Sequence, residues 1–414
     1  MNIAVLGNGA REDAISEKLI SENNKVFLIN NNNIRKNNVD IDINDFEKIK
    51  SFCLDNKVEL IIVGPENLLA NGIVDYFQNT NIKVFGPNKY ASLLESSKVF
   101  AKEFMKRNNV ATADYISFDK FDELEIKKVI NEKNGVLALK YDGLAAGKGV
   151  FVSDNIEDAY KNLEIIKDKY LSDNFKLIIE DSLVGREISI MSFTDSNVIK
   201  IFQASQDYKL SGNNNTGFNT GGMGAITPLD FVTTEVLSEI NNKIINPTLE
   251  GLKKDKINYN GFLYFGIILT KRGPYLLEYN VRMGDPETQV LLPALKTNFT
   301  NLIIKTLNNK LSDIESLKFS EDYYLSLVLA NDGYPLNYSN GEKIVIDENL
   351  VNCNIYYAGV KRNNNGELLT NGGRILNIVN SNKDINKLKN SVYLCAKHIK
   401  FKTKYFRDDI GKVY

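Results

Sequence analysis

Short apolar runs alternate with amphipathic stretches along the first part of the chain. The runs are rich in β-branched residues, and the stretches between them repeat their apolar positions with helical spacing. This alternation predicts a doubly wound α/β domain with a parallel sheet over residues 1–97. The predicted strands are 2–7, 25–30, 58–64 and 82–86, and the predicted helices are 11–21, 44–55 and 70–78.

A second unit with a less regular pattern is predicted over residues 98–318, with a lid subdomain at about 114–188. Its polar, glycine-rich segment 203–228 is typical of a binding loop rather than a linker. Residues 319–414 predict an α+β domain of short strands that ends in a helix around 391–401. The other elements expected in the second unit are a helix from about 97 to 113, strands within 175–195, 261–270 and 274–287, and helices at 233–253 and 297–309.

The stretch "LALKYDGLAAGKGVFVSD" carries glycines and a lysine between two apolar runs. It does not fit the phosphate loop G-x-x-x-x-G-K-[ST], because three residues separate Gly143 from Gly147 and Lys148 is followed by Gly149. Both flanks predict strands, whereas a phosphate loop leads into a helix. We therefore expect a glycine-rich hairpin that closes over a nucleotide as a lid.

Two lysines flank this loop in the predicted fold. Lys140 closes the strand before the loop, and Lys98 begins the preceding helix. A lone surface lysine is usually solvated, but Lys140 follows an apolar strand and opens a glycine loop. We therefore expect the two lysines to clamp the phosphates of the nucleotide.

The sequence "LLEYNVRMGDPETQ" holds the densest cluster of charged residues. On a strand, Glu278 and Asn280 point to one face, which Arg282 continues, while Asp285 and Glu287 follow in the turn. Such hard oxygen ligands suit Mg²⁺, which commonly takes one or two protein carboxylates together with phosphate oxygens. An ion-pair network on an exposed edge is the alternative. Apolar residues alternate with the charged ones, however, and buried charges need partners, so we favour a metal site.

The first turn, "GNGARE", allows two interpretations. Gly7 and Gly9 suggest a dinucleotide fingerprint, but Glu12 stands in place of its third glycine, and asparagines follow the second strand where a ribose-binding acid would be expected. A smaller phosphate on the helix N-terminus, with Arg11 beside it, fits better. The alternative is that the glycines only form a tight turn.

Composition limits the chemistry. The net charge of −1, from 51 basic and 52 acidic residues, argues against nonspecific nucleic-acid binding. Three cysteines without a C-x-x-C pair predict neither a disulfide framework nor a zinc site, and a reduced cytoplasmic setting is expected. No leader precedes the first strand, and no apolar run is long enough to span a membrane. The single histidine, His398, lies in the predicted last helix, which leaves carboxylates, lysines, arginines and metal ions for catalysis.

Five motifs in order, "DGLAAGKGV", "SQDYK", "NTGGMGA", "GFLYFG" and "EYNVRMGDPETQ", resemble the phosphoribosylamine–glycine ligase family of ATP-grasp enzymes. The resemblance extends over the whole chain, through "VLGNGARE", "VGPE", "FGPNK", "TNGGR" and "FRDDIG". It implies an N-terminal α/β domain, an ATP-grasp domain with a glycine-rich lid and a C-terminal α+β domain. It also implies that ATP, glycine and 5-phosphoribosylamine give ADP, phosphate and glycinamide ribonucleotide through glycyl phosphate, in the second step of purine synthesis. Mg²⁺ or Mn²⁺ would be the cofactor, the partners would be small molecules without nucleic acid or membrane, and the chain would be a monomer.

The resemblance also implies roles for individual residues. Glu278 and Asn280 would bind the metal, and Glu187 would bind the ribose of ATP. The catalytic residues would be Arg282, Asp285, Glu287 and Lys209. ATP would be bound by Lys98, Lys140, Gly143, Gly147, Lys148, Gly149, Glu180, Asp181, Leu183 and Glu187. The other substrates would be bound by Gly9, Arg11, Glu12, Glu66, Asp207, Lys209, Gly221, Gly222, Met223, Arg282, Gly373 and Arg374.

This sequence departs from the family pattern at several positions. Asp13 and Tyr208 replace histidines, and Leu210 replaces an arginine. Phe218 stands where proline is common, and Tyr141 where a small residue is common. The first three changes predict an altered affinity for the phosphoribosyl substrate, whereas the metal and lid residues are intact. An ATP-grasp ligase for another carboxylate and a nucleotide-binding protein without turnover remain as alternatives, and a dehydrogenase is the weakest.

Overall fold

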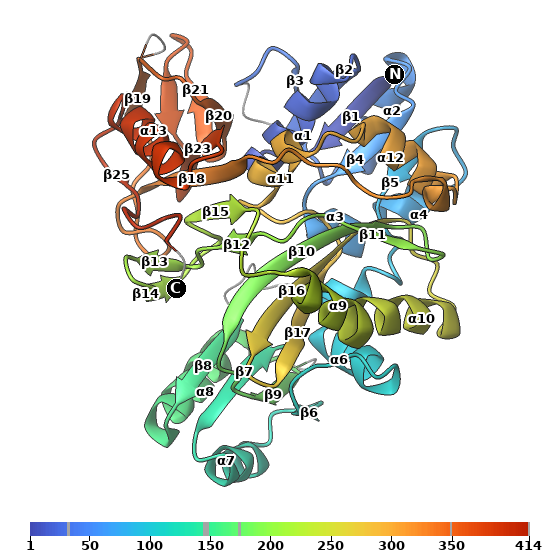
Figure 1. Ribbon diagram of the computed structural model, residues 1–414, viewed down its shortest axis with the longest axis vertical. Helices are drawn as coiled ribbons and strands as arrows, with labels where there is room; N and C mark the ends of the chain where they lie inside the picture. Colours follow the sequence, from blue (N-terminus) through green and yellow to red (C-terminus); the bar gives the residue numbers. More distant parts are fainter. Residues whose placement is uncertain (31–33, 144–148, 173–174, 348–349, 413–414) are drawn as a thin grey trace.

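The computed structural model describes residues 1–30, 34–143, 149–172, 175–347 and 350–412. Its N-terminal part is a five-stranded parallel sheet in the order β3-β2-β1-β4-β5 (Figure 1). The doubly wound sheet predicted from the apolar runs is confirmed. Its strands are β1 (Asn2–Leu6), β2 (Lys25–Asn30), β3 (Asn38–Asp40), β4 (Leu60–Val63) and β5 (Lys83–Phe85).

Two of the three helices predicted in this part are confirmed, and the structure adds a short helix at Leu93–Ser96 that was not predicted. The helix expected at 70–78 is divided, because Gly72 has φ +86°, a left-handed conformation that glycine adopts without steric cost. The helices are α1 (Ala10–Ser21), α2 (Phe46–Asp55), α3 (Glu66–Ala70), α4 (Ile73–Phe77), α5 (Leu93–Ser96) and α6 (Lys98–Arg107).

A separate antiparallel sheet in the order β6-β9-β7-β8 forms the lower part of the molecule in Figure 1. Its hairpin β7–β8 pairs Lys140 with Val150, so the predicted strand–loop–strand arrangement is confirmed. Helices α7 (Glu123–Glu132) and α8 (Ile156–Tyr170) pack their apolar faces against it. The strands are β6 (Tyr115–Phe118), β7 (Val136–Tyr141), β8 (Val150–Asp154) and β9 (Leu177–Asp181).

The central sheet is antiparallel in the order β11-β10-β16-β17. The helix expected at 233–253 consists of α9 (Thr234–Ile240), a π-helical turn (Asn241–Ile245) and α10 (Asn246–Lys254). The break precedes Pro247, which has no backbone N–H to continue the regular helical bonds. The strands are β10 (Arg186–Thr194), β11 (Ile199–Ile201), β16 (Gly261–Thr270) and β17 (Gly273–Asn280).

The polar segment 203–228, expected as a binding loop, contains four short strands. β12 (Gln206–Asp207) and β15 (Gly224–Thr227) join the C-terminal sheet, whose order is β12-β15-β18-β23-β20. All of β15 is buried, which explains why this glycine-rich stretch is ordered in a sheet. Between them, β13 (Leu210–Gly212) and β14 (Thr216–Asn219) form a hairpin, called here the 210–219 hairpin.

The remaining elements complete the C-terminal part. β25 pairs with β18, and β21-β22-β19-β24 form a smaller sheet. The helices are α11 (Thr288–Ala294), α12 (Phe299–Leu307), a short 3₁₀ turn (Leu311–Asp313) and α13 (Ile385–Lys397). The strands are β18 (Tyr323–Asn331), β19 (Lys343–Ile346), β20 (Asn354–Tyr357), β21 (Val360–Arg362), β22 (Leu368–Thr370), β23 (Arg374–Asn382), β24 (Ile399–Lys400) and β25 (Lys404–Tyr405).

The structure corrects two expectations about the end of the chain. The last helix ends before His398, which is its C-cap, and the following residues form β24 instead. Cys353 and Cys395 form a disulfide, contrary to the absence of disulfides expected from the sequence. The two cysteines are 42 residues apart, so only the packing of α13 beside β20 reveals the pair. Cys53 is a free, buried thiol, and burial raises its pKa to about 12.

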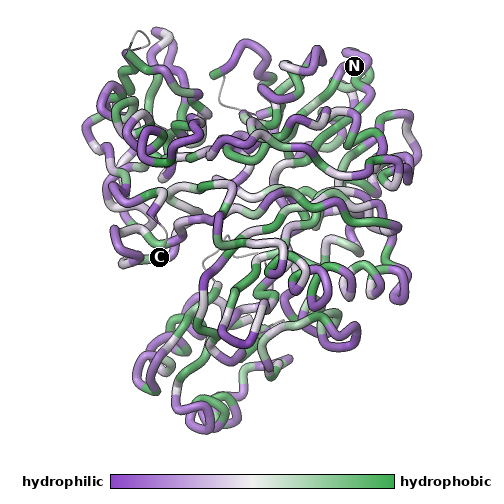
Figure 2. Tube along the Cα trace, viewed as in Figure 1, coloured by the Kyte–Doolittle hydropathy of each residue, from purple (hydrophilic) through white to green (hydrophobic). Residues whose placement is uncertain are grey.

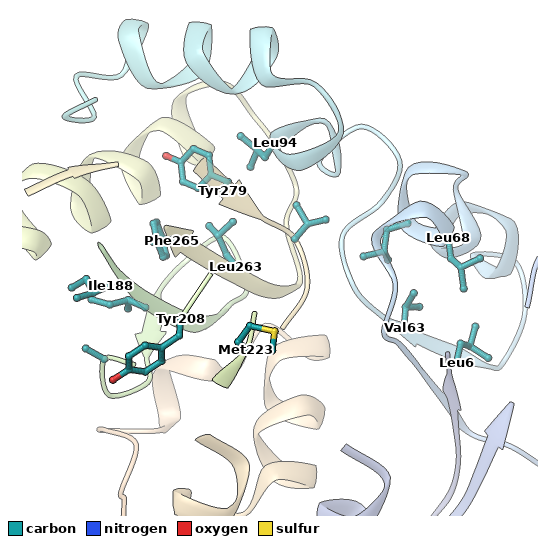
Figure 3. Packing of buried hydrophobic residues seen from close by; sticks show 14 of the residues in the cluster. Leu6, Val63, Leu68, Leu94, Ile188, Tyr208, Met223, Leu263, Phe265 and Tyr279 are labelled. Carbon is teal, nitrogen blue, oxygen red and sulfur yellow. The ribbon is translucent and has the colours of Figure 1, made fainter. Parts of the chain in front are cut away.

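The core follows the strands through all parts of the molecule. Figure 2 shows hydrophobic residues along the inner strands and hydrophilic residues on outer helices and loops. One buried cluster links Leu6 and Val63 of the N-terminal sheet with Leu263 and Phe265 of the central sheet (Figure 3). The parts are therefore packed on one another and can build a site between them. None of the helices in the described ranges is long and apolar enough to cross a membrane.

Candidate functional site

A cavity of about 470 Å³ lies where the lid sheet, the central sheet, the C-terminal sheet and the N-terminal part meet. Most of the site residues predicted from the sequence line it, although they are widely separated along the chain. The predicted residues in its walls are Arg11, Glu66, Lys140, Glu180, Asp181, Leu183, Glu187, Asp207, Lys209, Gly221, Glu278, Asn280, Arg282, Asp285, Glu287 and Arg374.

A second cavity, of about 160 Å³, shares several walls with the first and extends beneath the lid hairpin. Lys98, Gly143 and Gly149 line it, as predicted for residues of the ATP site. Gly147 and Lys148 lie outside the described residues. The shared wall residues are Glu66, Lys140, Val150, Glu180, Leu277, Glu278, Asn280 and Arg282.

Five predicted residues do not line either cavity: Gly9, Glu12, Gly222, Met223 and Gly373. Glu12 turns back into its own turn, where its Oε2 accepts the Gly9 N–H at 2.8 Å and its Oε1 pairs with Arg11 Nε at 2.6 Å. Met223 is fully buried in the core (Figure 3). These residues support the cavity walls rather than form them.

The glycine-rich first turn is explained by this position of Glu12. Gly7 has φ +125°, and a Cβ on it would lie 2.6 Å from Cγ of Glu12. Close packing therefore requires glycine there, in agreement with the tight-turn interpretation. Arg11 nevertheless reaches the cavity, with its Nη1 donating to the Met283 carbonyl at 3.1 Å, so an anion could still bind beside it.

Glu278 and Asn280 project from β17 into both cavities, because alternate residues of a strand share one face. Burial raises the pKa of the Glu278 carboxyl, but the charges of Lys209, Lys140 and Lys98 outweigh it, so this pKa lies below its ordinary value. The carboxylate is therefore ionised at neutral pH. An ionised carboxylate beside an amide oxygen is a suitable pair of ligands for a hard divalent cation.

The lysines of the clamp lie around the lid. Lys98 Nζ donates to the Gly143 carbonyl at 2.8 Å, and Lys140 Nζ pairs with Glu180 at 2.9 Å. Glu180 also pairs with Lys102 at 3.1 Å, while its other carboxylate oxygen has no hydrogen-bond partner in the described part of the chain. Burial lowers the pKa of Lys102 to about 8. Sequence reasoning missed Lys102, although its position one turn after Lys98 on the same helix face could have indicated it.

Arg282 joins the N-terminal part to the central sheet. Its Nε pairs with Glu66 at 3.3 Å, and its Nη2 pairs with Glu95 and donates to Asn280 Oδ1, both at 3.0 Å. Burial raises the pKa of Glu95 to about 7, while Arg282 opposes that rise. Glu95 was also missed, because α5 gives no sequence signal that it would face β17.

The turn after β17 is held from two sides. Asp285 pairs with Arg374 of the C-terminal sheet at 3.0 Å, and Glu287 accepts hydrogen bonds from Ser189 at 2.9 Å and Tyr264 at 3.2 Å. Both carboxylates line the larger cavity. Their positions are thus fixed before any substrate enters.

Asp207 and Lys209 form the wall contributed by the segment before the 210–219 hairpin. Lys209 Nζ pairs with Glu187 at 2.7 Å. Asp207 Oδ1 is buried and has no hydrogen-bond partner within the described ranges, and burial raises the pKa of this carboxyl well above its ordinary value. A buried acceptor without a partner is costly, so this oxygen is suited to receive a donor from a ligand.

The departures from the family pattern lie outside the cavities. Tyr208 points away from the cavity, with its ring buried and its hydroxyl donating to the Lys412 carbonyl at 3.0 Å. Tyr141 stacks on Tyr170, with the ring centroids 4.4 Å apart, which accounts for the bulky residue beside the lid. Leu210 and Phe218 lie on the 210–219 hairpin, where Phe218 is exposed.

Asp13 forms an ion pair that connects the N-terminal and C-terminal parts. Its carboxylate accepts from Arg35 Nε at 2.9 Å and Nη2 at 2.8 Å, and from the Tyr357 N–H of β20 at 2.9 Å. At this position, where the resemblance implies a histidine, the carboxylate is a structural connection and does not reach the cavity.

We expect Asp13→Asn to lower the free energy of unfolding by about 1–3 kcal/mol, because it removes the charge from a buried, hydrogen-bonded pair. Chemical denaturation measures this loss. Asp168→Asn, on the exposed side of α8, is the control and should change stability by less than about 0.5 kcal/mol. Unchanged stability with altered substrate affinity would show that Asp13 acts in the site instead.

Three family models match consecutive parts of the chain. They are described as the N domain (residues 1–95), the ATP-grasp (A) domain (96–288) and the C domain (324–413) of phosphoribosylglycinamide synthetase. A phosphoribosylamine–glycine ligase of Fusobacterium nucleatum is 40% identical over 100% of this chain and 99% of its own length. One of Clostridium acetobutylicum is 38% identical over 100% of both chains.

Solved structures give the same picture of the fold. The crystal structure of a phosphoribosylamine–glycine ligase from Thermotoga maritima superposes with a TM-score of 0.86 at 29% identity, covering 99% of this chain and 100% of that one. The biotin carboxylase domain of Hydrogenobacter thermophilus 2-oxoglutarate carboxylase, solved with MgADP, superposes with a TM-score of 0.74 at 16% identity, covering 98% and 91%. This second likeness concerns the fold alone.

Proposed function

This chain belongs to the phosphoribosylglycinamide synthetase family, and we propose that it joins glycine to 5-phosphoribosylamine while ATP is converted to ADP and phosphate. The product is glycinamide ribonucleotide, a purine precursor. One observation carries this proposal. Arg11, Glu278 and Arg374, from three separately matched parts of the chain, line a single cavity.

The first step activates glycine. A carboxylate oxygen of glycine attacks the γ-phosphorus of ATP, the bond between that phosphorus and the β–γ bridging oxygen breaks, and glycyl phosphate and ADP result. Lys98, Lys140 and Lys209 supply positive charge around the phosphates, as a step with developing negative charge requires. Arg282 and Asp285 would orient the carboxylate and the amine of glycine, and their positions in the cavity wall support these roles.

Glu278 and Asn280 would hold Mg²⁺ or Mn²⁺, and the bound ion would neutralise charge on the transferred phosphoryl group. The ionised state of Glu278 and the oxygen donors of both residues support this assignment. Gly143 and Gly149 would then form the two ends of the lid over the nucleotide. Glu180, Asp181 and Leu183 would lie at the end of the nucleotide that carries the base, and Glu187 would lie beside its ribose.

The second step forms the carbon–nitrogen bond. The amine of phosphoribosylamine attacks the carbonyl carbon of glycyl phosphate, inorganic phosphate leaves with the C–O bonding electrons, and the new amide nitrogen loses a proton. Asp207 would accept a hydrogen bond from this amine, and its position in the cavity wall with an oxygen that has no partner among the described residues supports this role. Arg11 and Arg374 offer positive charge to the ribose phosphate.

A coupled assay of ADP release tests the proposal, run with ATP and Mg²⁺ and with glycine or phosphoribosylamine omitted in turn. We expect sustained ADP release only when both substrates are present, together with a product of the mass of glycinamide ribonucleotide. Equal ADP release without glycine, or with another amino acid in its place, would contradict the proposal. ATP binding without any turnover would favour a role without catalysis.

We propose that the chain acts as a monomer in the cytoplasm with small-molecule substrates alone. The proposed site residues from the N, A and C parts of the chain meet at one cavity, so the proposed site needs no residue from a second copy. The proposed reaction consumes ATP, a cytoplasmic metabolite. Sedimentation of the active protein tests the oligomeric state, and activity that appears only in a larger assembly would contradict it.

A further inference from the structure

The end of the chain packs closely against the 210–219 hairpin, behind the cavity wall (β13, β14 and β25 in Figure 1). We define residues 405–412 as the C-terminal strap and propose that it positions this hairpin and the Asp207–Lys209 wall for the ribosylamine substrate. Arg407 is its principal positioning residue. The proposal rests on the proposed function of that wall and explains which contacts hold the wall in position.

Arg407 holds the hairpin with a fully buried side chain. Its Nη1 donates to the Leu210 carbonyl at 2.8 Å and its Nη2 donates to Asn215 Oδ1 at 3.1 Å. Asp409 pairs with the same guanidinium at 2.8 Å and accepts the Asn214 N–H at 2.7 Å. The first strand of the hairpin and the turn that follows it are therefore fixed to one buried ion pair.

Further contacts extend along the strap. Tyr405 donates its hydroxyl to the Ser211 carbonyl at 2.7 Å, and the Asp408 N–H donates to Asn213 Oδ1 at 3.1 Å. The second strand of the hairpin, β14, is exposed along its whole length. The strap holds the hairpin from the C-terminal part.

Tyr208 connects the C-terminal strap to the cavity wall. Its hydroxyl donates to the Lys412 carbonyl and accepts the Gly411 N–H, both at 3.0 Å, and the Arg407 guanidinium lies over its ring at 5.3 Å from the centroid. Asp207 and Lys209, its two neighbours in the chain, line the cavity on the opposite side. The strap thus sets the position of a residue whose neighbours form the wall. The aromatic residue that replaces the family histidine at 208 serves as its attachment point.

The test uses the full-length enzyme with two mild variants, Arg407→Lys and Tyr405→Phe. The first keeps the charge but loses the forked donors, and the second removes one hydroxyl. We expect both to raise KM for phosphoribosylamine roughly two- to tenfold and KM for ATP by a smaller factor, because each loses one or two hydrogen bonds and Lys209, which pairs with Glu187, also faces the nucleotide. Hydrogen exchange of peptides covering 207–221 should become faster in both.

Lys404→Gln is the matched control. Lys404 precedes the strap and donates to the Ala396 and Ile399 carbonyls, so its replacement disturbs the same part of the chain without touching the hairpin. We expect unchanged exchange in 207–221 and unchanged KM for both substrates. Should Arg407→Lys fail to fold, Tyr405→Phe still decides the matter.

Unchanged exchange in 207–221 for the two strap variants would overturn the proposal, and so would an equal rise in KM for ATP. Loss of the proposed function is distinguishable from both outcomes. A wild-type enzyme that does not require phosphoribosylamine would contradict the function, whereas faster exchange in the variants would still support the strap.

Discussion

Glu278→Ala is expected to lower kcat for ADP release by at least about a hundredfold while leaving the fold intact. Glu278 is an ionised carboxylate that lines both cavities, and its loss removes one of the two proposed metal ligands. The fold should persist, because no hydrogen bond or ion pair within the described residues depends on this side chain. Steady-state ADP release and thermal unfolding measure the two effects.

Glu250→Ala is the control for this experiment. Glu250 is an exposed carboxylate on α10 that pairs only with nearby Lys253 among the described residues, so turnover and stability should both remain near the wild-type values. Near-normal turnover in Glu278→Ala would place the metal site elsewhere. A large fall in melting temperature would show that Glu278 has a structural role.

Arg282→Met is expected to lower the free energy of unfolding by about 3–5 kcal/mol and to abolish activity as well. The guanidinium lies between Glu66 and Glu95, and its removal leaves Glu95 buried without its cation. Since an uncompensated buried charge is far more costly than a missing surface contact, stability should fall even though methionine fits the space. Chemical denaturation and the ADP assay provide the readouts.

Arg272→Met, an exposed arginine in the turn between β16 and β17, is the matched control and should change stability by less than about 0.5 kcal/mol. Arg282→Lys should recover part of the stability, because it keeps the charge but not the forked geometry. If Arg282→Met proved as stable as the control, groups other than Arg282 would have to hold Glu66 and Glu95. The contact between the N-terminal part and the central sheet would then not depend on this arginine.

The repeating patterns of the sequence predicted most of the helices and strands of the fold. The alternation of β17 predicted that Glu278 and Asn280 share a face, and the failed phosphate-loop spacing predicted the lid hairpin. These predictions work because side chains two apart on a strand, and the strands on either side of a glycine turn, are linked by local geometry.

Contacts between distant segments could not be predicted in the same way. Glu95 reaches Arg282 across 187 positions of the chain (282 − 95), and neither residue carries a local sign of the other. The same holds for the pair of Cys353 and Cys395. At Tyr208 the residue type alone led to a wrong interpretation. It suggested a changed substrate site, but in the structure the side chain points away from the cavity, towards Lys412.

The shared sheet of β12, β15 and β18 affects how this enzyme could be recombined. A chimera that exchanged only residues 319–414 would pair β15 of one parent with β18 of the other, along the contacts from Gly224–Leu327 to Thr227–Tyr324. The side chains that meet across this buried pair of strands would then come from different parents, and mismatched cross-strand neighbours weaken a sheet. Modular exchange between relatives would therefore have to transfer the 206–227 region together with the C-terminal part, so that the inherited unit is discontinuous in the gene.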